Sequence, residues 1–290
     1  MRVNTFRYWK LVMPIFKCHG IDWVYPPDWF SSERDIALVQ RISDWTPEEN
    51  FFNVFLDSHE PDFFLETKSS EVLERHEDFD LIVTRRPELL HLPNAIRFCY
   101  GTTWIREEVR EKLSKNKSPK VSYTMTTKYW ESESGETVDG YQLRFQILDM
   151  WSKVESLSAL PIDFYESEKW PMGIFPLSLE GEHGRDVLME YMFHIAVENC
   201  RTPNYFSEKL MDCFMTKTLP IYFGCPNISE YFDTSGMIII DNLSNLNVVL
   251  SNLTVDDYET RKEAIDRNFE LAKQYEKFPD RLFTEIEKRI

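Results

Sequence analysis

The residues of this chain that could best support chemistry lie between Glu198 and Lys209. Glu198 and Asn199 place a carboxylate beside an amide, and both groups can hydrogen-bond to hydroxyls or to backbone. Tyr205, Glu208 and Lys209 add a phenol, a second carboxylate and an ammonium group a few residues later. Such a concentration of ionisable and hydrogen-bonding side chains in one short segment indicates a binding site for a polar ligand.

The elements around these residues indicate how they would be brought together. Residues 192–197 and 219–223 are apolar and predict two short strands, and residues 200–204 contain a proline and predict a loop. Apolar side chains recur at three- and four-residue spacing from Phe206 to Phe214, which predicts an amphipathic helix. A strand, a helix and a strand form a parallel unit that binds ligands beyond the carboxyl ends of its strands. The charged residues between 198 and 209 fall at that edge.

The composition indicates a globular protein with room for two domains. The chain has 290 residues, of which 42% are hydrophobic and 14% aromatic. No apolar run reaches the roughly 18 residues that a membrane-spanning helix needs. Residues 11–16 are too short an apolar segment for a convincing signal peptide. We therefore expect a soluble, cytoplasmic protein.

The charge and the cysteines exclude further classes of protein. With 33 basic and 49 acidic residues the formal net charge is −16, which argues against nucleic acids and anionic membranes as partners. The five cysteines are odd in number, and no two have the C-x-x-C spacing of a zinc or redox site. We expect reduced, mostly buried thiols at Cys18, Cys99, Cys200, Cys213 and Cys225.

The pattern of apolar segments predicts two α/β domains. Short apolar segments that predict buried strands lie at residues 53–56, 81–84, 95–99 and 121–125. Residues 105–117 predict a charged helix that ends before Ser118 and Pro119, and we place the domain boundary there. Residues 143–153 predict an amphipathic helix, and residues 255–290 predict one or two helices with a break at Pro279.

Several motifs together resemble glycosyltransferase family 10, the family of α-1,3/1,4-fucosyltransferase-like enzymes. They are FHIAVEN at 193–199, YFSEKL at 205–210, LPIYFG at 219–224, KVSYTMTTK at 120–128 and GYQLR at 140–144. Residues 225–233 and 236–240 extend the similarity. The resemblance covers residues 120–241 well, whereas the first hundred residues match only loosely.

The resemblance implies an inverting transfer of fucose from GDP-fucose to a hydroxyl of an acceptor glycan, with no cofactor required. It also implies a GT-B-type fold, in which two Rossmann-like domains face a central cleft. Residues 1–117 would form the acceptor-side domain and residues 118–290 the domain that binds the nucleotide sugar. The last helix would cross back to the first domain.

A diphosphate leaving group needs positive charge in this otherwise acidic chain, because cations aimed at developing phosphate charge make a large contribution to catalysis. The resemblance places Arg144 at the position of the family's phosphate-binding arginine, and a guanidinium suits phosphate geometry. Lys209, at the start of a predicted helix whose dipole favours anions, is the second candidate. Ser122 and Lys128 are further candidate phosphate contacts.

The remaining candidates each have a structural alternative. By resemblance, Glu208 holds the ribose or the sugar, although helix capping would also explain it. Asn199 could bind sugar hydroxyls or simply form a turn, and Tyr205 could contact the nucleotide or pack in the core. Glu198 could bind the donor, or it could be a strand-end carboxylate that accepts from loop amides.

In this family the general base is a carboxylate of the N-terminal domain, commonly in a short E-S-P or E-x-P segment at a strand end, and this sequence departs from the simple E-S-P form. Glu60, directly before Pro61, is our candidate, and Asp57 and His59 are its competitors. A carboxylate desolvated by bound substrates would gain the proton affinity that a base needs.

Metal dependence is not indicated by the sequence. We identify no D-x-D motif of the kind that metal-using transferases employ to bridge a diphosphate and a cation, Asp256 and Asp257 suit a helix cap, and the six histidines lack metal-ligand spacing. Two alternatives stay open: a transferase of the same fold that uses another nucleotide sugar, and a glycan-binding protein that has lost catalysis. A Rossmann dehydrogenase or methyltransferase is disfavoured, because no G-x-G-x-x-G follows a predicted strand.

Overall fold

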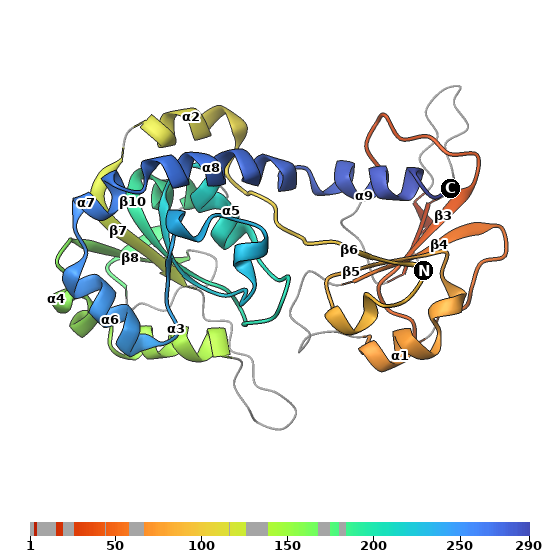
Figure 1. Cartoon of the computed structure of the whole chain (residues 1–290), viewed down its shortest axis with the longest axis horizontal. Helices are drawn as coiled ribbons and strands as arrows, with labels where there is room; N and C mark the ends of the chain where they lie inside the picture. The colour runs from red at the N-terminus through yellow and green to blue at the C-terminus, as the bar shows by residue number, and fades with distance from the viewer. Residues whose placement is uncertain are drawn as a thin grey trace. The chain divides into compact units, whose positions relative to one another are not determined.

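The chain divides by its internal contacts into two compact units, which are described separately here (Figure 1). The computed structural model describes residues 3–4, 16–19, 26–43, 45–57, 67–115, 117–125, 139–167, 175–179 and 184–290. The first unit comprises residues 1–100 and 277–290, and the second comprises residues 101–276. Helix α2 (Glu107–Lys115) therefore groups with the second unit, whereas the sequence-based boundary at residue 117 places it in the first.

The first unit contains a sheet whose described strands lie side by side in chain order. They are β1 (Val3–Asn4), β2 (Phe16–His19), β3 (Asp35–Val39), β4 (Phe51–Leu56), β5 (Leu81–Thr84) and β6 (Ala95–Arg97). β1 pairs antiparallel with β2, and the later neighbours pair in parallel. Every residue of β4 and β5 is buried, as expected of central parallel strands with both faces covered. The buried strands predicted within residues 53–56 and 81–84 are confirmed, whereas the strand predicted at 95–99 is limited to β6, whose residues are partly buried or exposed.

Two apolar cores lie on opposite faces of this sheet, because Val54 and its neighbour Phe55 belong to different ones. The helical segments of the unit are α1 (Ser69–Glu74), η2 (His76–Asp78), η3 (Pro87–Leu89) and α9 (Phe278–Glu287). α9 comes from the end of the chain and contributes Phe278, Leu282, Phe283 and Ile286 to the core around Val54. Pro279 lies in the first turn of this helix, where its missing N–H removes no hydrogen bond within the helix.

The second unit contains a parallel sheet with a reversal in its strand order. Its described strands are β7 (Ser118–Met125), β8 (Ile162–Ser167), β9 (Leu177–Leu179), β10 (Tyr191–Val197), β11 (Leu219–Phe223) and β12 (Ile238–Ile239). They lie in the order β12-β11-β10-β7-β8-β9, and each neighbouring pair is parallel. This is the doubly wound order, in which the chain adds strands outward from β7 and then outward from β10. The predicted α/β class is thus confirmed, with parallel sheets in both units.

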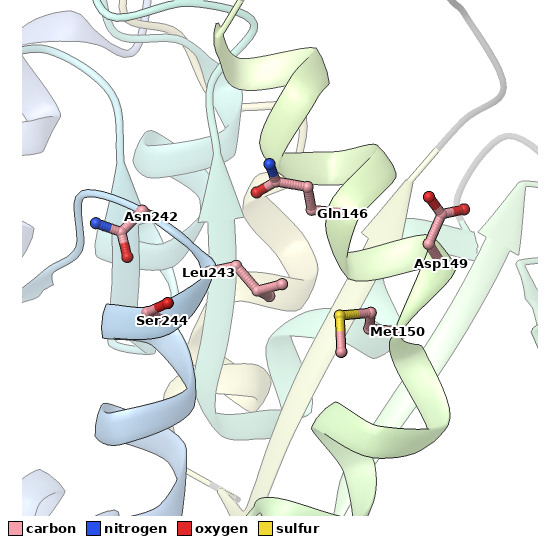
Figure 2. Close-up of a pocket in the computed structure, with 6 residues that line it drawn as sticks. All are labelled: Gln146, Asp149, Met150, Asn242, Leu243 and Ser244. Carbon is pink, nitrogen blue, oxygen red and sulfur yellow. The ribbon is translucent and has the colours of Figure 1, made fainter.

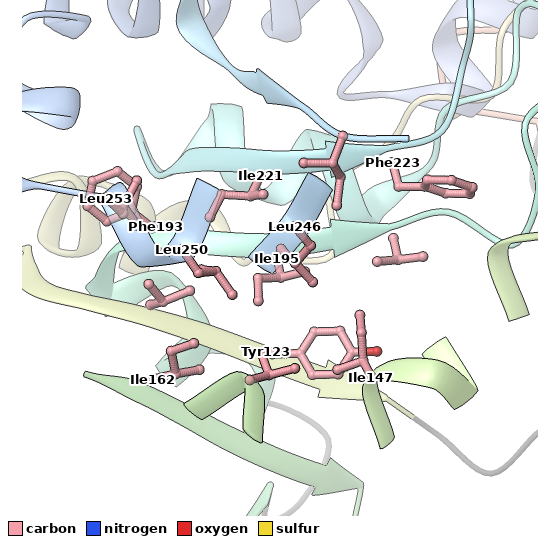
Figure 3. Packing of buried hydrophobic residues seen from close by; sticks show 14 of the residues in the cluster. Tyr123, Ile147, Ile162, Phe193, Ile195, Ile221, Phe223, Leu246, Leu250 and Leu253 are labelled. Atoms are coloured by element: carbon pink, nitrogen blue, oxygen red, sulfur yellow. The ribbon is translucent and has the colours of Figure 1, made fainter. Parts of the chain in front are cut away.

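The helical segments of the second unit surround this sheet. Besides α2 they are α3 (Asp139–Asp149), α4 (Trp151–Leu157), η4 (Gly184–Glu190), α5 (Glu208–Met215), η5 (Ile228–Glu230), η6 (Thr234–Gly236), α6 (Leu243–Asn252), α7 (Val255–Glu259), α8 (Lys262–Ala272) and η7 (Lys273–Tyr275). Figure 3 shows Ile147 of α3 and Leu246 and Leu250 of α6 packed with strand residues such as Ile195. The predicted helix over 143–153 is divided into α3 and α4, since the backbone of Met150 leaves the helical conformation.

α5 is more deeply buried than an amphipathic pattern predicts, because every residue from Leu210 to Met215 is buried. The described part of the chain contains no helix that is long and apolar enough to cross a membrane. The thiols predicted to be reduced and buried are confirmed for the cysteines whose side chains are described: Cys99, Cys200, Cys213 and Cys225.

Candidate functional site

The strand order of the second sheet reverses between β7 and β10, and the candidate residues gather where β10 ends. Glu198 and Asn199 directly follow Val197, the last residue of β10. Helix α3 begins against this strand end: a Cβ atom added to Gly140 would lie 2.0 Å from the carbonyl oxygen of Glu198 and 2.4 Å from that of Asn199. Glycine is needed there because the helix and the strand end approach each other so closely. Such a reversal is where doubly wound sheets bind their ligands.

Arg144, one turn further along α3, is a buried cation attached to the same strand end. The residue is 7% exposed, and its Nη2 donates a hydrogen bond to the carbonyl oxygen of Val197. Its guanidinium carbon lies 5.1 Å from the centre of the Tyr141 ring. Within the described residues no carboxylate pairs with this guanidinium. A buried cation without a counter-ion carries a desolvation cost that a bound anion would offset, so Arg144 is suited to bind an anion.

Glu198 is fully buried and holds the start of helix α5. Its Oε1 accepts from the backbone N–H of Ser207 at 2.8 Å, and its Oε2 accepts from the Ser207 hydroxyl at 2.6 Å. Burial raises the pKa of this carboxyl above its ordinary value, while Lys209 opposes the shift and Glu208 adds to it. These contacts match the structural alternative predicted for Glu198, a strand-end carboxylate that accepts from loop amides.

Lys209 lies in the first turn of α5, and its ammonium group is surrounded by acceptors. Its Nζ lies 2.9 Å from Oε1 of Glu208, 3.2 Å from Oγ of Ser207 and 3.9 Å from Oε2 of Glu198. Arg144 and Lys209 thus contact consecutive residues at the end of β10, Val197 and Glu198. Two cations that are far apart along the chain therefore both contact the end of β10, Arg144 through a backbone carbonyl and Lys209 through a side chain.

The other predicted residues of this segment are less available to a ligand. Tyr205 is 3% exposed, so its ring is almost entirely covered by protein and core packing describes it better than stacking on a nucleotide. The Glu208 side chain is 12% exposed and pairs with Lys209. Asn199 is half-buried beside the start of α3.

Ser122 does not lie at a strand end, and this corrects its prediction as a phosphate contact. It sits inside β7, where it is registered with His194 of β10, and its side chain is fully buried. Its hydroxyl donates to the carbonyl oxygen of Leu188 at 2.6 Å and lies 2.8 Å from Nδ1 of His194. The strand continues to Met125, so the position belongs to the interior of the sheet. Lys128 lies outside the described residues.

The predicted base Glu60 and its competitor His59 also lie outside the described residues, but Asp57 does not. Its carboxylate is 1% exposed and forms an ion pair with Arg86, with Oδ1 2.6 Å from Nη2. Its Oδ2 also accepts from the Thr84 hydroxyl at 2.8 Å. Asp57 is therefore a structural carboxylate that joins the ends of β4 and β5, and we withdraw it as a candidate base.

Sequence reasoning missed two groups at the carboxyl edge of the second sheet. Asn204 adopts a left-handed backbone with φ of 62°, and its Oδ1 accepts from Nδ2 of Asn227 at 2.9 Å. The Pro-Asn pair at this loop was a usable signal, since asparagine tolerates this conformation. The second is Arg201, a third cation. Its guanidinium carbon lies 5.3 Å from the centre of the Phe223 ring, and its Nη2 pairs with Oδ1 of Asp241 at 3.0 Å.

A pocket of about 440 Å³ lies between α3 and α6 (Figure 2). Its lining residues are Gln146, Asp149, Met150, Asn242, Leu243 and Ser244. Gln146 and Asp149 are exposed, whereas Arg144 belongs to the buried face of α3. The pocket is therefore separate from the Arg144 site. Among the residues that the structure describes, no cluster of histidine, cysteine and acidic side chains could hold a metal ion.

Comparison with known proteins finds similarity over most of the second unit. Residues 149–279 match the family model of glycosyltransferase family 10 (fucosyltransferase), C-terminal part. Alpha-(1,3)-fucosyltransferase B of Drosophila melanogaster is 28% identical over 122 residues, which cover 36% of this chain and 27% of the relative. GDP-fucose protein O-fucosyltransferase 3 of Xenopus tropicalis is 31% identical over 65 residues, which cover 22% of this chain and 14% of the relative. The chain thus spans less than a third of the length of either relative.

The whole chain also has similar solved structures. The crystal structure of an alpha1,3-fucosyltransferase with GDP is 14% identical, with a TM-score of 0.49, and the match covers 99% of this chain and 92% of that one. The sequence resemblance to glycosyltransferase family 10 is confirmed by the family match and by the fucosyltransferase relatives.

Proposed function

We propose that this chain, whose residues 149–279 belong to glycosyltransferase family 10, is an inverting fucosyltransferase that moves fucose from GDP-fucose to a hydroxyl of an acceptor glycan. One observation carries the proposal. Arg144 is a buried guanidinium without a carboxylate partner in the described residues, and it lies where the strand order reverses. This position and this charge suit the diphosphate of a nucleotide sugar.

The proposed reaction is a single displacement at the anomeric carbon of fucose. The bond from this carbon to the acceptor oxygen forms while its bond to the phosphate oxygen of GDP breaks. Negative charge then develops on the diphosphate, and we assign its stabilisation to Arg144 and Lys209 together with the N-terminus of α5. The proposal requires no metal ion, because these groups supply the positive charge.

The acceptor hydroxyl must lose its proton as it attacks, and we assign this proton to the carboxylate of Glu60. Inversion places the attacking group opposite the leaving group, so the base acts on the face of the sugar away from GDP. The withdrawal of Asp57, whose carboxylate is engaged by Arg86, favours Glu60 over this competitor.

The assignment of guanosine and fucose rests on the relatives, since their names specify fucosyl transfer and, in one case, GDP-fucose. A transferase of the same fold that uses another nucleotide sugar is the alternative. Tight binding of UDP with no binding of GDP would favour that alternative.

Calorimetric titration with GDP tests the proposal directly. We expect Arg144→Ala and Lys209→Ala each to weaken GDP binding by roughly tenfold or more, because each removes a charge-assisted contact to phosphate. Arg261→Ala is the matched control, since Arg261 is a partly exposed cation of the same unit that pairs with Asp257. Unchanged GDP affinity in both site variants would remove the basis of the proposal.

A further inference from the structure

The Ser207 hydroxyl contacts both the buried carboxylate of Glu198 and the ammonium group of Lys209, which we assign to donor binding. Its hydroxyl oxygen lies 2.6 Å from Oε2 of Glu198 and 3.2 Å from Nζ of Lys209. The direct distance between that carboxylate oxygen and the ammonium nitrogen is 3.9 Å, longer than a hydrogen-bonded ion pair. The hydroxyl therefore bridges Glu198 and Lys209, whose charged groups share it and do not form a direct hydrogen bond with each other.

The direction of the hydrogen bonds is fixed by the chemistry of the partners. Glu198 has only acceptor oxygens when ionised, so the Ser207 hydroxyl must donate its single proton to it. The lone pairs of Oγ are then left for the backbone N–H of Lys209, at 3.3 Å, and for its ammonium group, at 3.2 Å. Ser207 thus satisfies the carboxylate and orients the lysine at the same time.

We propose that Ser207 is a positioning residue that keeps the Lys209 ammonium from forming a direct hydrogen bond with Glu198 and so leaves it available to the diphosphate of the donor. This inference rests on the proposed function, because it takes Lys209 to be a donor contact. Oε1 of Glu208 also accepts from this ammonium group, at 2.9 Å, and Glu208 is half-buried.

Removal of the hydroxyl should weaken donor binding through the lysine. In Ser207→Ala the buried carboxylate loses one donor, and the nearest group able to replace it is the Lys209 ammonium. We expect the Kd for GDP to rise about 3- to 10-fold, the range for losing one pre-ordered long side chain. Ser207→Thr keeps the hydroxyl and should retain GDP affinity within about twofold.

A simple helix cap would also be lost in Ser207→Ala, so the decisive measurement is a double-mutant cycle. A Glu198→Gln background lacks the buried carboxylate that would capture the ammonium, and there we expect the same serine substitution to change the Kd for GDP by less than about twofold. Equal effects of the serine substitution in both backgrounds would overturn the inference. Ser207→Gly provides a second variant, because glycine removes the hydroxyl at smaller cost to the helix start.

Thr254→Ala is the matched control. Thr254 starts α7 in the same unit, and its hydroxyl also donates to a carboxylate, that of Asp257 at 2.9 Å. It should lower stability as a lost cap does without changing the Kd for GDP. If Lys209→Ala leaves GDP binding unchanged, the proposed function is at fault; if Lys209→Ala weakens binding but Ser207→Ala and Ser207→Gly do not, only the inference on Ser207 fails.

Discussion

At the scale of single residues, the site contains two buried charges with opposite surroundings. Glu198 accepts both a backbone N–H and a hydroxyl and is fully buried. Arg144 donates to one carbonyl oxygen and has no carboxylate partner in the described part of the chain. A satisfied buried charge holds structure together, whereas an unsatisfied one has capacity left for a ligand. This difference separates the structural carboxylate Glu198 from Arg144, the residue that we propose to bind the donor.

The satisfied carboxylate should make stability depend on pH. Burial raises the pKa of Glu198 in the folded state, so its contribution to stability is complete below the unfolded pKa of about 4.3 and is lost as pH rises through the higher folded pKa. Glu198→Gln stays uncharged and avoids this loss. We therefore expect the free energy of unfolding of Glu198→Gln, relative to the natural chain, to increase as the pH is raised above about 4.3.

Urea denaturation of both proteins across this range measures the effect. A constant offset between them would reflect the altered hydrogen bonds to Ser207 alone and would contradict the pH prediction. Glu263→Gln is the control, because the Glu263 side chain is 95% exposed and lies on α8 of the same unit.

The sequence alone singled out the candidate residues, but it did not predict the contacts that each of them makes. The segment from Glu198 to Lys209 was singled out by its residue types and spacing, and Arg144 by a motif. The sequence could not show that Glu198 turns inward to Ser207 or that the Tyr205 ring is covered, because both facts depend on contacts with distant elements. Ser122 was misplaced for a related reason: alternation predicts a strand but does not say that it continues to Met125.

At the scale of elements, the strand-helix-strand unit from β10 to β11 was predictable because its patterns are strong and local. β10, α5 and β11 lie where the apolar alternation and the helical spacing predicted them. The order of the strands in the sheet was not predictable from periodicity, since it depends on which strands pair. That order is what places the start of α3 beside the end of β10.

The contact between α3 and β10 can be tested at Gly140. Alanine normally stabilises a helix relative to glycine, but here the added Cβ would lie 2.0 Å from a backbone oxygen. We expect Gly140→Ala to destabilise the second unit by about 1–3 kcal/mol, as overpacking does, and to weaken GDP binding because α3 also carries Arg144. Thermal unfolding and GDP titration measure the two effects. Gln142→Ala, on the exposed face of α3, is the control, and a Gly140→Ala protein as stable as this control would show that α3 does not depend on the close contact.

At the scale of the whole molecule, the two units carry separate assignments. Arg144, Lys209 and Ser207 all belong to the second unit, whereas Glu60 follows β4 of the first. The return of residues 277–290 to the first unit was expected from the family resemblance and not from the helical pattern itself. The pattern predicts that these residues are helical, but Leu282 and Phe283 are covered by a core whose other members lie between Phe30 and Tyr100.

This separation predicts that removal of the base carboxylate leaves donor binding unchanged. Glu60→Gln should leave the Kd for GDP unchanged, because the contacts assigned to the diphosphate lie in the other unit. Transfer of fucose from GDP-fucose to an acceptor should fall by roughly 10²- to 10⁴-fold, the contribution typical of a general base. Parallel GDP titration and turnover assays test both halves. Near-normal turnover of Glu60→Gln would contradict the assignment of the base to Glu60. The base would then be a residue other than Asp57, because the Asp57 carboxylate already binds Arg86 and Thr84.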